Sequence, residues 1–343
     1  MATTFKTLNS ANDVTSTRTL LHEAIPLTGT IASGTYTDEN IKTYSHGMFE
    51  SVYDYPYLSS SANHIFDITT GYASNSSLSG AAGGVQNSKK INVYSQMAQV
   101  LVGYDATGSI QSFDQDGDIA DGGTKIKEAL FVNFSRLLSK DEIKKGSFEM
   151  AVYTAGAMPA LTTTLTIADH GAATSYKVNS PAGEYGILYT GSAADAGTGV
   201  GLIYYQAGVA VLTGSVFAAS LMGPGVTVAT GYSAIATGST IDVMANCFRN
   251  RIHNISFNNT VELNSTVYFC RASHNEFNYS ANPTYLSESQ IRVKNSTTDN
   301  PVSYVTTVGL YSSDNELLAV AKLSEPLKKD PSTEVTLRVR LDF

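Results

Sequence analysis

The densest group of residues that could do chemistry is an acidic loop around Asp114. Asp114, Asp116 and Asp118 alternate with uncharged residues. Three carboxylates on every second residue can converge on one hard cation, as at the start of a calcium loop. The remaining pattern departs from such a loop, because Gly117 is at the fourth position instead of the sixth and Lys125 holds the twelfth position in place of a bidentate Glu. The sequence favours an acidic hairpin loop, with calcium at Asp114, Asp116 and Asp118 as the alternative. It predicts no other cofactor.

Catalytic constellations are absent from the sequence as motifs. There is no Gly-x-Ser-x-Gly elbow, no His-Glu-x-x-His and no phosphate loop with its lysine. The Asp169-His170 neighbours would point to opposite faces of a strand, so the pair orients nothing by itself. We predict no enzyme activity. Paired carboxylates for polysaccharide cleavage stay an alternative, since their separation is set in three dimensions. The histidines are scattered along the chain: His22, His46, His64, His170, His253 and His274.

The two cysteines, Cys247 and Cys270, are too few for a zinc site and lack Cys-x-x-Cys spacing. Free cysteines are among the residues most often buried, where they behave as small apolar side chains. Two free thiols are the favoured interpretation, and a disulfide between them is the alternative.

Composition limits the partners. The chain has 343 residues, a net charge of -8 and only 15% charged residues. It is long enough for two or three domains, and its acidic balance argues against a nucleic-acid surface, which needs clustered Lys and Arg. The N-terminal residues lack an apolar signal segment. The longest apolar region, 199–212, contains Gln206 and is too short to span a bilayer. These features predict a cytosolic product that assembles into something larger.

The elements that must position these residues are mostly strands. Residues 304–311 and 316–323 flank Ser312-Ser313-Asp314-Asn315, which tolerates turn geometry, so they predict a β-hairpin. Residues 334–343 alternate apolar with polar side chains at period two, which predicts a third antiparallel strand with one buried face. The apolar positions of that strand are Val335, Leu337, Val339, Leu341 and Phe343.

Three short helices are also predicted. Residues 91–102 carry apolar residues at helical spacing and end before Gly103, and residues 139–146 begin with a Ser-x-x-Glu capping box. Residues 239–253 have one apolar face, with Arg249 and Arg251 in the last turn, where cations suit the helix dipole. A solvated face explains these arginines as well as binding of a phosphate or a partner carboxylate does.

A change in composition suggests the domain boundaries. Residues 151–240 contain four charged residues and several strand-like runs separated by glycine-containing turns. We predict an inserted, low-charge β-rich domain at 151–240, partly covered by another subunit, and a discontinuous scaffold domain formed by 1–150 together with 241–343. The fold class is mainly β, with antiparallel sheets in sandwich-like domains and a few short helices. The four charges are Asp169, Lys177, Glu184 and Asp195.

Several phrases resemble known proteins. VGLYSSDNELLAVAKL looks like a hairpin of structural and tail-fibre-related proteins of tailed bacteriophages. NHIFDITTGY, INVYSQMAQVLVGYD, ALFVNFSRLLSKDEIKKGSF and HNEFNYSANPTY are similar to virion structural proteins of large tailed phages. The resemblance implies an oligomeric building block of the tail, baseplate or neck, located in the virion and assembled in the host cytoplasm.

Partners also follow from this resemblance. It implies contacts with copies of the chain itself, as a homo-oligomer, and with other virion proteins, and it names no catalytic residue. Together with the composition it predicts no nucleic-acid partner and no membrane partner. A receptor- or glycan-binding β-module of a tail fibre or spike is the alternative function.

Overall fold

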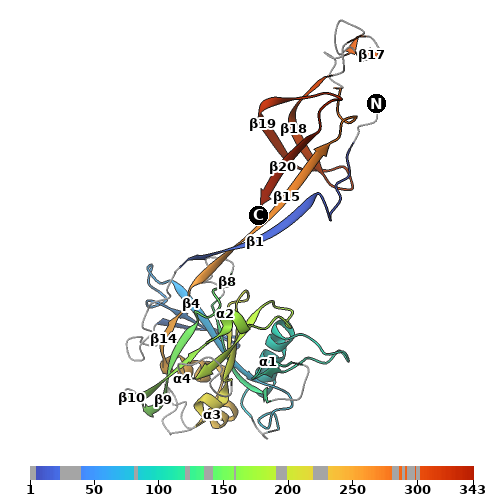
Figure 1. Ribbon diagram of the computed structural model, residues 1–343. Helices are drawn as coiled ribbons and strands as arrows, with labels where there is room; N and C mark the ends of the chain where they lie inside the picture. Colours follow the sequence, from blue (N-terminus) through green and yellow to red (C-terminus); the bar gives the residue numbers. More distant parts are fainter. Residues whose placement is uncertain are drawn as a thin grey trace. The chain divides into compact units, whose positions relative to one another are not determined.

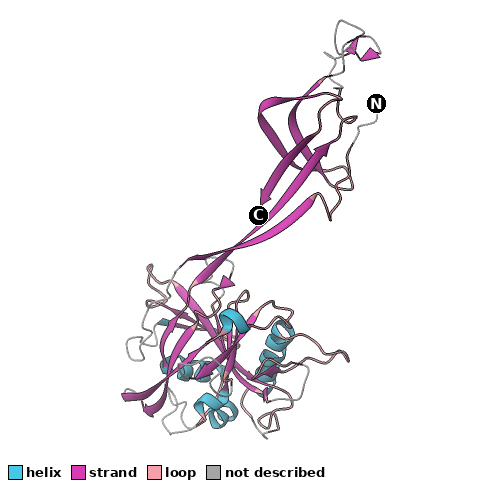
Figure 2. Ribbon diagram, viewed as in Figure 1, coloured by secondary structure: helices cyan, strands magenta, loops and turns pink. Residues whose placement is uncertain are grey.

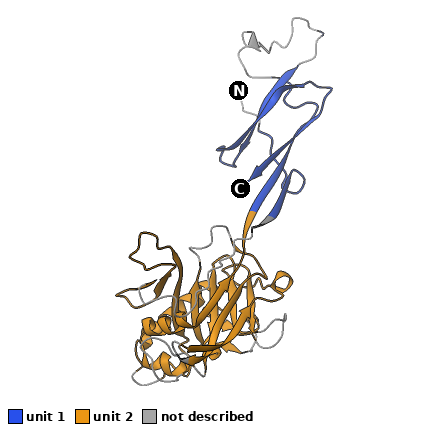
Figure 3. Cartoon of the chain, turned by 90° about the vertical axis from the view of Figure 1, so that its left-hand side faces the viewer, with its two compact units in different colours: residues 1–19, 263–343 blue, residues 20–262 orange. Residues whose placement is uncertain are grey.

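The chain forms two compact units (Figure 3). Unit 1 contains residues 1–19 and 263–343, and unit 2 contains residues 20–262. Strands predominate over helices (Figure 2), so the mainly β prediction is confirmed. The computed structural model describes residues 5–23, 40–80, 84–119, 124–134, 142–157, 160–190, 199–218, 231–279, 286–287, 290–291, 298 and 302–343.

Unit 2 is built on a ten-stranded sheet in which every neighbouring pair is antiparallel (Figure 1). The two-stranded ladder of β5 (Phe113–Asp114) and β6 (Lys125–Ile126) lies beside it in the same unit. In spatial order the ten strands are β14 (Ile252–Ser256), β9 (Glu149–Ala157), β10 (Ala160–Ala168), β11 (Tyr185–Thr190), β12 (Gly201–Tyr204), β13 (Val209–Thr213), β7 (Glu128–Asn133), β4 (His64–Tyr72), β3 (Glu50–Tyr53) and β2 (Ile41–Thr43).

Apolar side chains on both faces of this sheet are buried. Along β7, Leu130 belongs to one hydrophobic cluster with Phe248, whereas Phe131 belongs to a second cluster with Tyr94. Successive residues of a strand point to opposite faces, so a sheet covered on both sides needs continuous apolar runs. The covering elements are α1 (Asn87–Leu101) on one face and η3 (Gly214–Phe217), α3 (Tyr232–Gly238) and α4 (Ile241–Arg251) on the other.

Helix α1 packs on β4 at a glycine. A Cβ added at Gly71 would lie 2.5 Å from the carbonyl oxygen of Lys90 and 2.8 Å from the amide nitrogen of Tyr94. Both atoms belong to the helix backbone, which cannot move aside as a side chain could. Gly71 therefore permits the close approach between helix and strand, and with it the burial of Tyr94.

The predicted inserted domain is not a separate body. Strand β13 pairs with β7, and β9 pairs with β14, so residues 151–240 supply strands to the same sheet as the flanking sequence. The chain divides instead after residues 19 and 262. All residues of β12 and β13 are buried inside unit 2, which explains why these two strands carry no charge, whereas most of β10 is exposed or half-buried. The cover of β12 and β13 comes from the same chain.

Unit 1 is made from both ends of the chain. Its three-stranded ladder places β15 (Asn259–Ala272), which enters from unit 2, between β1 (Val14–Glu23) and β20 (Val335–Asp342). A hairpin of β18 (Ser303–Tyr311) and β19 (Leu317–Lys329) completes it, together with the short ladder of β16 (Leu286–Ser287) and β17 (Gln290–Ile291). In unit 2, the start of β15 pairs with β8 (Glu142–Ile143).

The C-terminal predictions are largely confirmed. The β18–β19 hairpin exists, and Asn315 in its turn has φ +64°, the left-handed geometry expected of that residue. Along β20, Leu337 and Leu341 are half-buried while Arg338 is exposed. Three details were wrong. Strand β20 pairs with β15 rather than with the hairpin, and β19 continues to Lys329, beyond the predicted end at residue 323. Phe343, which we predicted on the buried face, is 75% exposed.

Two of the three predicted helices are confirmed. Helix α1 ends before Gly103, whose φ of +89° suits a stop, and α4 follows the predicted apolar face. The helix at 139–146 was wrong, because Glu142–Ile143 is strand β8 and pairs with β15. Residues 139–141 lie outside the described part of the chain. The capping-box pattern favours a helix locally, but pairing with a distant strand outweighs this local preference.

Candidate functional site

The acidic loop is a hairpin turn held by a lysine. Asp114 pairs with Lys125 in the β5–β6 ladder, and the Lys125 ammonium also forms a salt bridge with the Asp114 carboxylate. The same ammonium donates to the backbone oxygens of Asp118, at 3.1 Å, and Ile119, at 3.2 Å. Asp114 and Asp116 each accept a backbone amide two residues further on, at 3.0 and 3.1 Å.

These bonds engage the carboxylates of Asp114 and Asp116, two of the three candidate calcium ligands, the third of which is Asp118. Among the described residues, which include all three, no group of three His, Cys, Asp or Glu side chains could hold a metal ion. Burial raises the pKa of Asp114, and its bond with Asp116 raises it further, while that same bond lowers the pKa of Asp116. The lysine at the twelfth position supplies a positive charge to the loop, and the β5–β6 ladder confirms the predicted hairpin.

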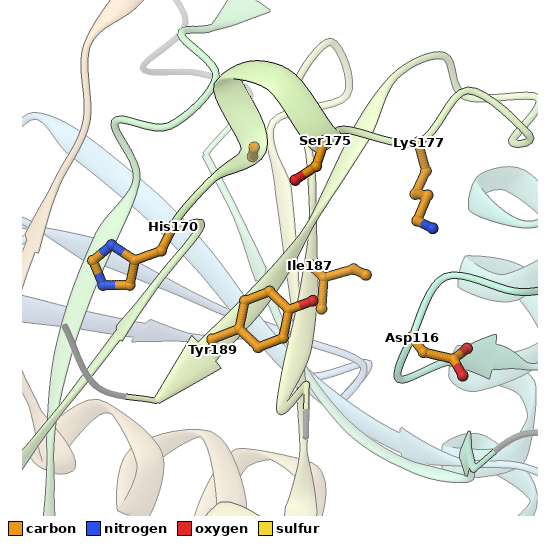
Figure 4. A pocket seen from close by; sticks show the side chains of 7 residues that line it. Asp116, His170, Ser175, Lys177, Ile187 and Tyr189 are labelled. Carbon is orange, nitrogen blue, oxygen red and sulfur yellow. The ribbon is translucent and has the colours of Figure 1, made fainter. Parts of the chain in front are cut away.

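A shallow pocket of about 230 Å³ lies next to this loop in unit 2 (Figure 4). Tyr189 and Ile187 of β11 lie between His170 on one side and Asp116 with Lys177 on the other. The stem of Lys177 packs on the turn, 3.0 Å from where a Gly117 Cβ would be. The lining residues are Asp116, His170, Ala172, Ser175, Lys177, Ile187 and Tyr189.

The pocket offers mixed charge rather than a reaction centre. It brings together one carboxylate, one ammonium, one imidazole and two hydroxyls. The Ser175 hydroxyl, at the end of α2 (Ala172–Ser175), donates to the carbonyl of Gly171 at 2.9 Å, so its proton is directed to the backbone. A nucleophile needs a base aligned with that proton. None of the pocket residues except Asp116 was singled out from sequence as a site residue; His170 was noted only as a neighbour of Asp169.

Buried ionisable residues close to the pocket fix a loop. Asp169 accepts from the amides of Gly146 at 2.8 Å and Phe148 at 3.0 Å, and from the Tyr205 hydroxyl at 2.9 Å. Burial raises the pKa of Asp169 to about 6. Asp169 is buried while its neighbour His170 lines the pocket, so the two side chains do separate as predicted. Each oxygen of Asp169 is engaged by the loop, which is a structural role.

Lys145 forms a second buried ionic group. Its ammonium lies 2.6 Å from the Glu184 carboxylate and 3.1 Å from the Glu142 carboxylate. It also lies over the rings of Tyr176, at 5.1 Å, and Tyr205, at 5.5 Å. Burial by itself would lower the pKa of Lys145, but its bonds with the two carboxylates outweigh burial and raise that pKa. They tie β8 to the segment before β11.

The arginines of α4 are structural. Arg251 is completely buried and donates to the carbonyls of Ala155 and Gly156, both at 3.0 Å. Arg249 is 2% exposed and donates to the Asn40 amide oxygen at 2.8 Å. A solvated face, one of the two interpretations left open from the sequence, does not apply to them, because Arg249 bonds to Asn40 just before β2 and Arg251 bonds to the backbone of β9. Burial lowers the pKa of Arg251.

Both thiols are free, as predicted. Cys247 is buried in α4, and Cys270 is partly buried in β15. Burial raises the pKa of Cys247 to about 12 and also raises that of Cys270. The thiolate is the reactive form of cysteine, so neither side chain is poised as a nucleophile at neutral pH.

A buried lysine in each unit is a polar hub. In unit 2, the Lys90 ammonium donates to the carbonyls of Val85 at 2.9 Å, Ala236 at 2.6 Å and Ser239 at 2.5 Å, joining the start of α1 to the end of α3. Its side chain is completely buried, and burial lowers its pKa to about 8, partly offset by Asp242.

Lys329 does the same in unit 1. It is completely buried at the end of β19, and its ammonium donates to the Asn278 side chain at 2.7 Å, the carbonyl of Asp330 at 3.0 Å and that of His274 at 3.2 Å. Asn278 in turn donates to His274 at 2.7 Å. The hub holds the segment after β15 against the hairpin.

Unit 1 has almost no apolar core of its own. Both hydrophobic clusters consist of unit 2 residues. Among the described residues of unit 1, the buried apolar side chains are Val267, Val302, Leu310 and Val339, and each is still 7–9% exposed. Exposed large apolar side chains are instead frequent: Phe5, Phe277, Tyr279, Tyr304, Tyr311, Leu317, Leu318, Val320, Leu327 and Phe343.

The outer face of the β18–β19 hairpin collects several of these side chains. Leu318 is 67% exposed and Val320 is 51% exposed. A signal for this was present in the sequence: Leu317 and Leu318 are consecutive, so an alternating strand must expose one of them. The sequence predicted the hairpin itself, but the exposed apolar side chains on it were not predicted.

No helix in the described ranges is long and apolar enough to cross a membrane. Known proteins offer no template from which a function could be transferred to these surfaces. No protein-family model, curated protein or solved structure matches the chain.

Proposed function

We propose that the chain is a structural building block of a tailed-phage virion, present in several copies in the tail, baseplate or neck. Its partners are copies of itself and other virion proteins, and it assembles in the host cytoplasm. The mechanism is burial of apolar and aromatic surface between subunits. The chain has no catalytic role in this proposal.

The observation that carries the proposal is the exposed apolar surface of unit 1. A β-layer with so little buried apolar area gains little hydrophobic stabilisation alone, since that stabilisation is roughly proportional to the apolar area removed from water. Large exposed apolar patches on soluble proteins mark interaction sites. The resemblance of VGLYSSDNELLAVAKL to phage structural proteins supplies the kind of assembly, and it falls on the hairpin that carries the exposed residues.

The polar features of unit 2 are consistent with this role. Its buried ions, Asp169, Lys145, Arg251 and Lys90, are engaged in bonds that hold loops and helix ends. The Asp114 carboxylate is engaged by Lys125. These bonds support a rigid body better than a reaction centre.

Mass spectrometry of purified particles, with light scattering of the isolated protein, tests the proposal. We expect the chain in the particle at a fixed multiple of a symmetric copy number, and cryo-electron microscopy should place it in tail, baseplate or neck. A stable monomer that is absent from the particle would refute the proposal and direct attention to glycan binding and polysaccharide cleavage.

A further inference from the structure

The hairpin of unit 1 carries a compact apolar patch. We define the hairpin patch as Phe5, Tyr311, Leu317, Leu318 and Val320, which are 46–67% exposed. Its members surround one glycine. Gly309 is opposite Val320 in the β18–β19 ladder, and a Cβ on Gly309 would lie 2.9 Å from the Tyr311 ring and 3.3 Å from a Leu317 methyl.

Two further contacts complete the hairpin patch. The rings of Phe5 and Tyr311 meet edge to face with centroids 5.0 Å apart, which brings the N-terminal segment onto the hairpin. Tyr311 pairs with Leu317 whereas Leu310 pairs with Ala319, so Leu318 is the extra residue of an irregularity in β19, directly beside Leu317. Phe5, Tyr311, Leu317 and Val320 therefore gather around Gly309 from two distant parts of the chain, with Leu318 next to them.

The charges at its two ends are opposite. Lys322 follows Val320 by two residues on the same face, whereas Asp314 and Glu316 lie in or beside the hairpin turn at the other end. Within the described part of the chain, none of these three side chains forms a salt bridge. The face thus runs from a negative end through an apolar centre to a positive end.

We infer that a second copy of this chain packs on the hairpin patch, face to face and antiparallel, about a twofold axis. This inference rests on the proposed function and names its self-association contact. In a twofold contact each subunit presents the same surface, so residue i meets j and j meets i. With the axis perpendicular to the strands, Lys322 of each copy lies near Glu316 and Asp314 of the other.

Net charge also favours a copy of the chain as the occupant. Unit 1 contains ten Lys and Arg and ten Asp and Glu, whereas unit 2 contains twelve and twenty, so the whole net charge of -8 belongs to unit 2. Two unit 1 surfaces meet without net repulsion, but two unit 2 surfaces repel each other. A nucleic acid would require a positive surface, which unit 1 does not provide.

The area is adequate for such a contact. Half-exposed side chains of this size present on the order of 100 Å² each, or roughly 500 Å² for the hairpin patch. A specific interface buries about 800 Å² per partner, with an apolar centre and a polar rim. The charged ends, Lys322 on one side and Asp314 with Glu316 on the other, provide that rim.

The first test disrupts the apolar centre in the full-length protein. Leu318→Glu with Val320→Glu should weaken self-association about a hundred-fold or more, measured by sedimentation over a concentration series. The matched control, Leu58→Glu with Val100→Glu, adds the same charges at an exposed leucine and an exposed valine of unit 2 and should leave self-association unchanged. Circular dichroism melting checks that both variants fold.

The second test uses the opposite ends. Lys322→Glu alone and Glu316→Lys alone should each weaken self-association roughly ten-fold, because each places like charges across the axis. Mixing the two variants should restore association as a heterodimer, since position 322 of each copy then faces an opposite charge at position 316 of the other. A role in folding of one chain would give no such rescue in the mixture.

The outcomes separate this inference from the proposed function. Wild-type oligomers that resist the Leu318→Glu, Val320→Glu change, or a lack of rescue on mixing, would overturn the hairpin contact while leaving a structural role intact. A monomeric chain found in the particle would also overturn the contact and would assign the hairpin patch to another virion protein. A monomer absent from the particle would overturn both.

Discussion

The two units of this protein solve the problem of stability in different ways. Unit 2 buries apolar side chains on both faces of one large sheet, and many of them, such as Leu130 and Val211, are completely inaccessible to solvent. In unit 1 the one completely buried side chain among the described residues is Lys329, a cation surrounded by oxygen acceptors. Unit 2 is complete as a single chain, whereas unit 1 has a polar hub and an apolar exterior. The difference teaches that the unit formed by the chain ends, unlike unit 2, leaves most of its large apolar side chains exposed, which is why we propose that it is the unit that associates.

Removing β20 should give the largest difference between the units. Deletion of residues 334–343 takes away the ladder from Ser265 to Ala272 on β15, so unit 1 should unfold. Unit 2 contains none of these residues and should stay folded. Hydrogen exchange should show lost protection in β15, β18 and β19 with unchanged protection in β4, β7 and β13. Loss of protection in both units would contradict the view that unit 2 is stable without unit 1.

Two leucine truncations compare the cores directly. Leu130→Ala in β7, at a completely buried site, should lower the free energy of unfolding of unit 2 by about 3–5 kcal/mol. Leu310→Ala in β18, at a site that is 9% exposed in a sparse core, should lower that of unit 1 by about 2 kcal/mol or less. Denaturant titration followed by hydrogen exchange in each unit measures both. Equal losses would show that unit 1 has a core of ordinary quality.

The polar hubs allow a matched replacement by an apolar side chain of similar length. Lys90→Met and Lys329→Met each leave three buried acceptors without their donor, so each should lower the stability of its own unit by about 2 kcal/mol. Because unit 1 has less apolar stabilisation, Lys329→Met should reduce its melting temperature by the larger amount. Differential scanning calorimetry resolves the two transitions. A larger drop for Lys90→Met would contradict this.

A pH effect is the smallest expected difference and belongs to unit 2. The pKa of Asp169 is about 6 in the folded chain and 3.8 as an ordinary carboxyl, so the folded state holds the proton more tightly. Between these pH values the stability contributed by Asp169 falls as pH rises, by about 1 kcal/mol or more. Asp169→Asn should remove this slope from the melting curves of unit 2. An unchanged slope would assign the pH dependence to other groups.

Local patterns were enough to predict many of the elements. The alternation in β20, the turn residues of the hairpin, the apolar stripe of α4 and the stop at Gly103 each follow from side-chain periodicity and backbone preference within a few residues. The same is true of the acidic hairpin. In the sequence, Gly117 at the fourth position and Lys125 at the twelfth already depart from a calcium loop, and in the structure Lys125 forms a salt bridge with Asp114.

What a pattern over a few residues could not contain is which distant segments pair. Low charge at 151–240 predicted a separate domain, but this window supplies strands to a sheet that extends from β2 to β14, and two of these strands, β12 and β13, are fully buried. The helix predicted at 139–146 gave way to the pairing of Glu142 with Thr260. The burial of three cations could not be predicted, because their hydrogen-bond acceptors lie in distant segments that approach them only when the chain folds. These cations are Arg249, Arg251 and Lys329.

The sequence by itself therefore determined the β character, the hairpin, two of the three predicted helices and the acidic loop, since each depends on neighbours along the chain. Only the tertiary structure decided where the chain divides, which cations are buried and which face of the hairpin stays apolar and uncovered. These depend on contacts between residues more than a hundred positions apart, such as Lys90 with Ser239 and Phe5 with Tyr311. Burial of a residue depends on which other segments pack over it. The pattern of one segment alone is compatible with several such arrangements.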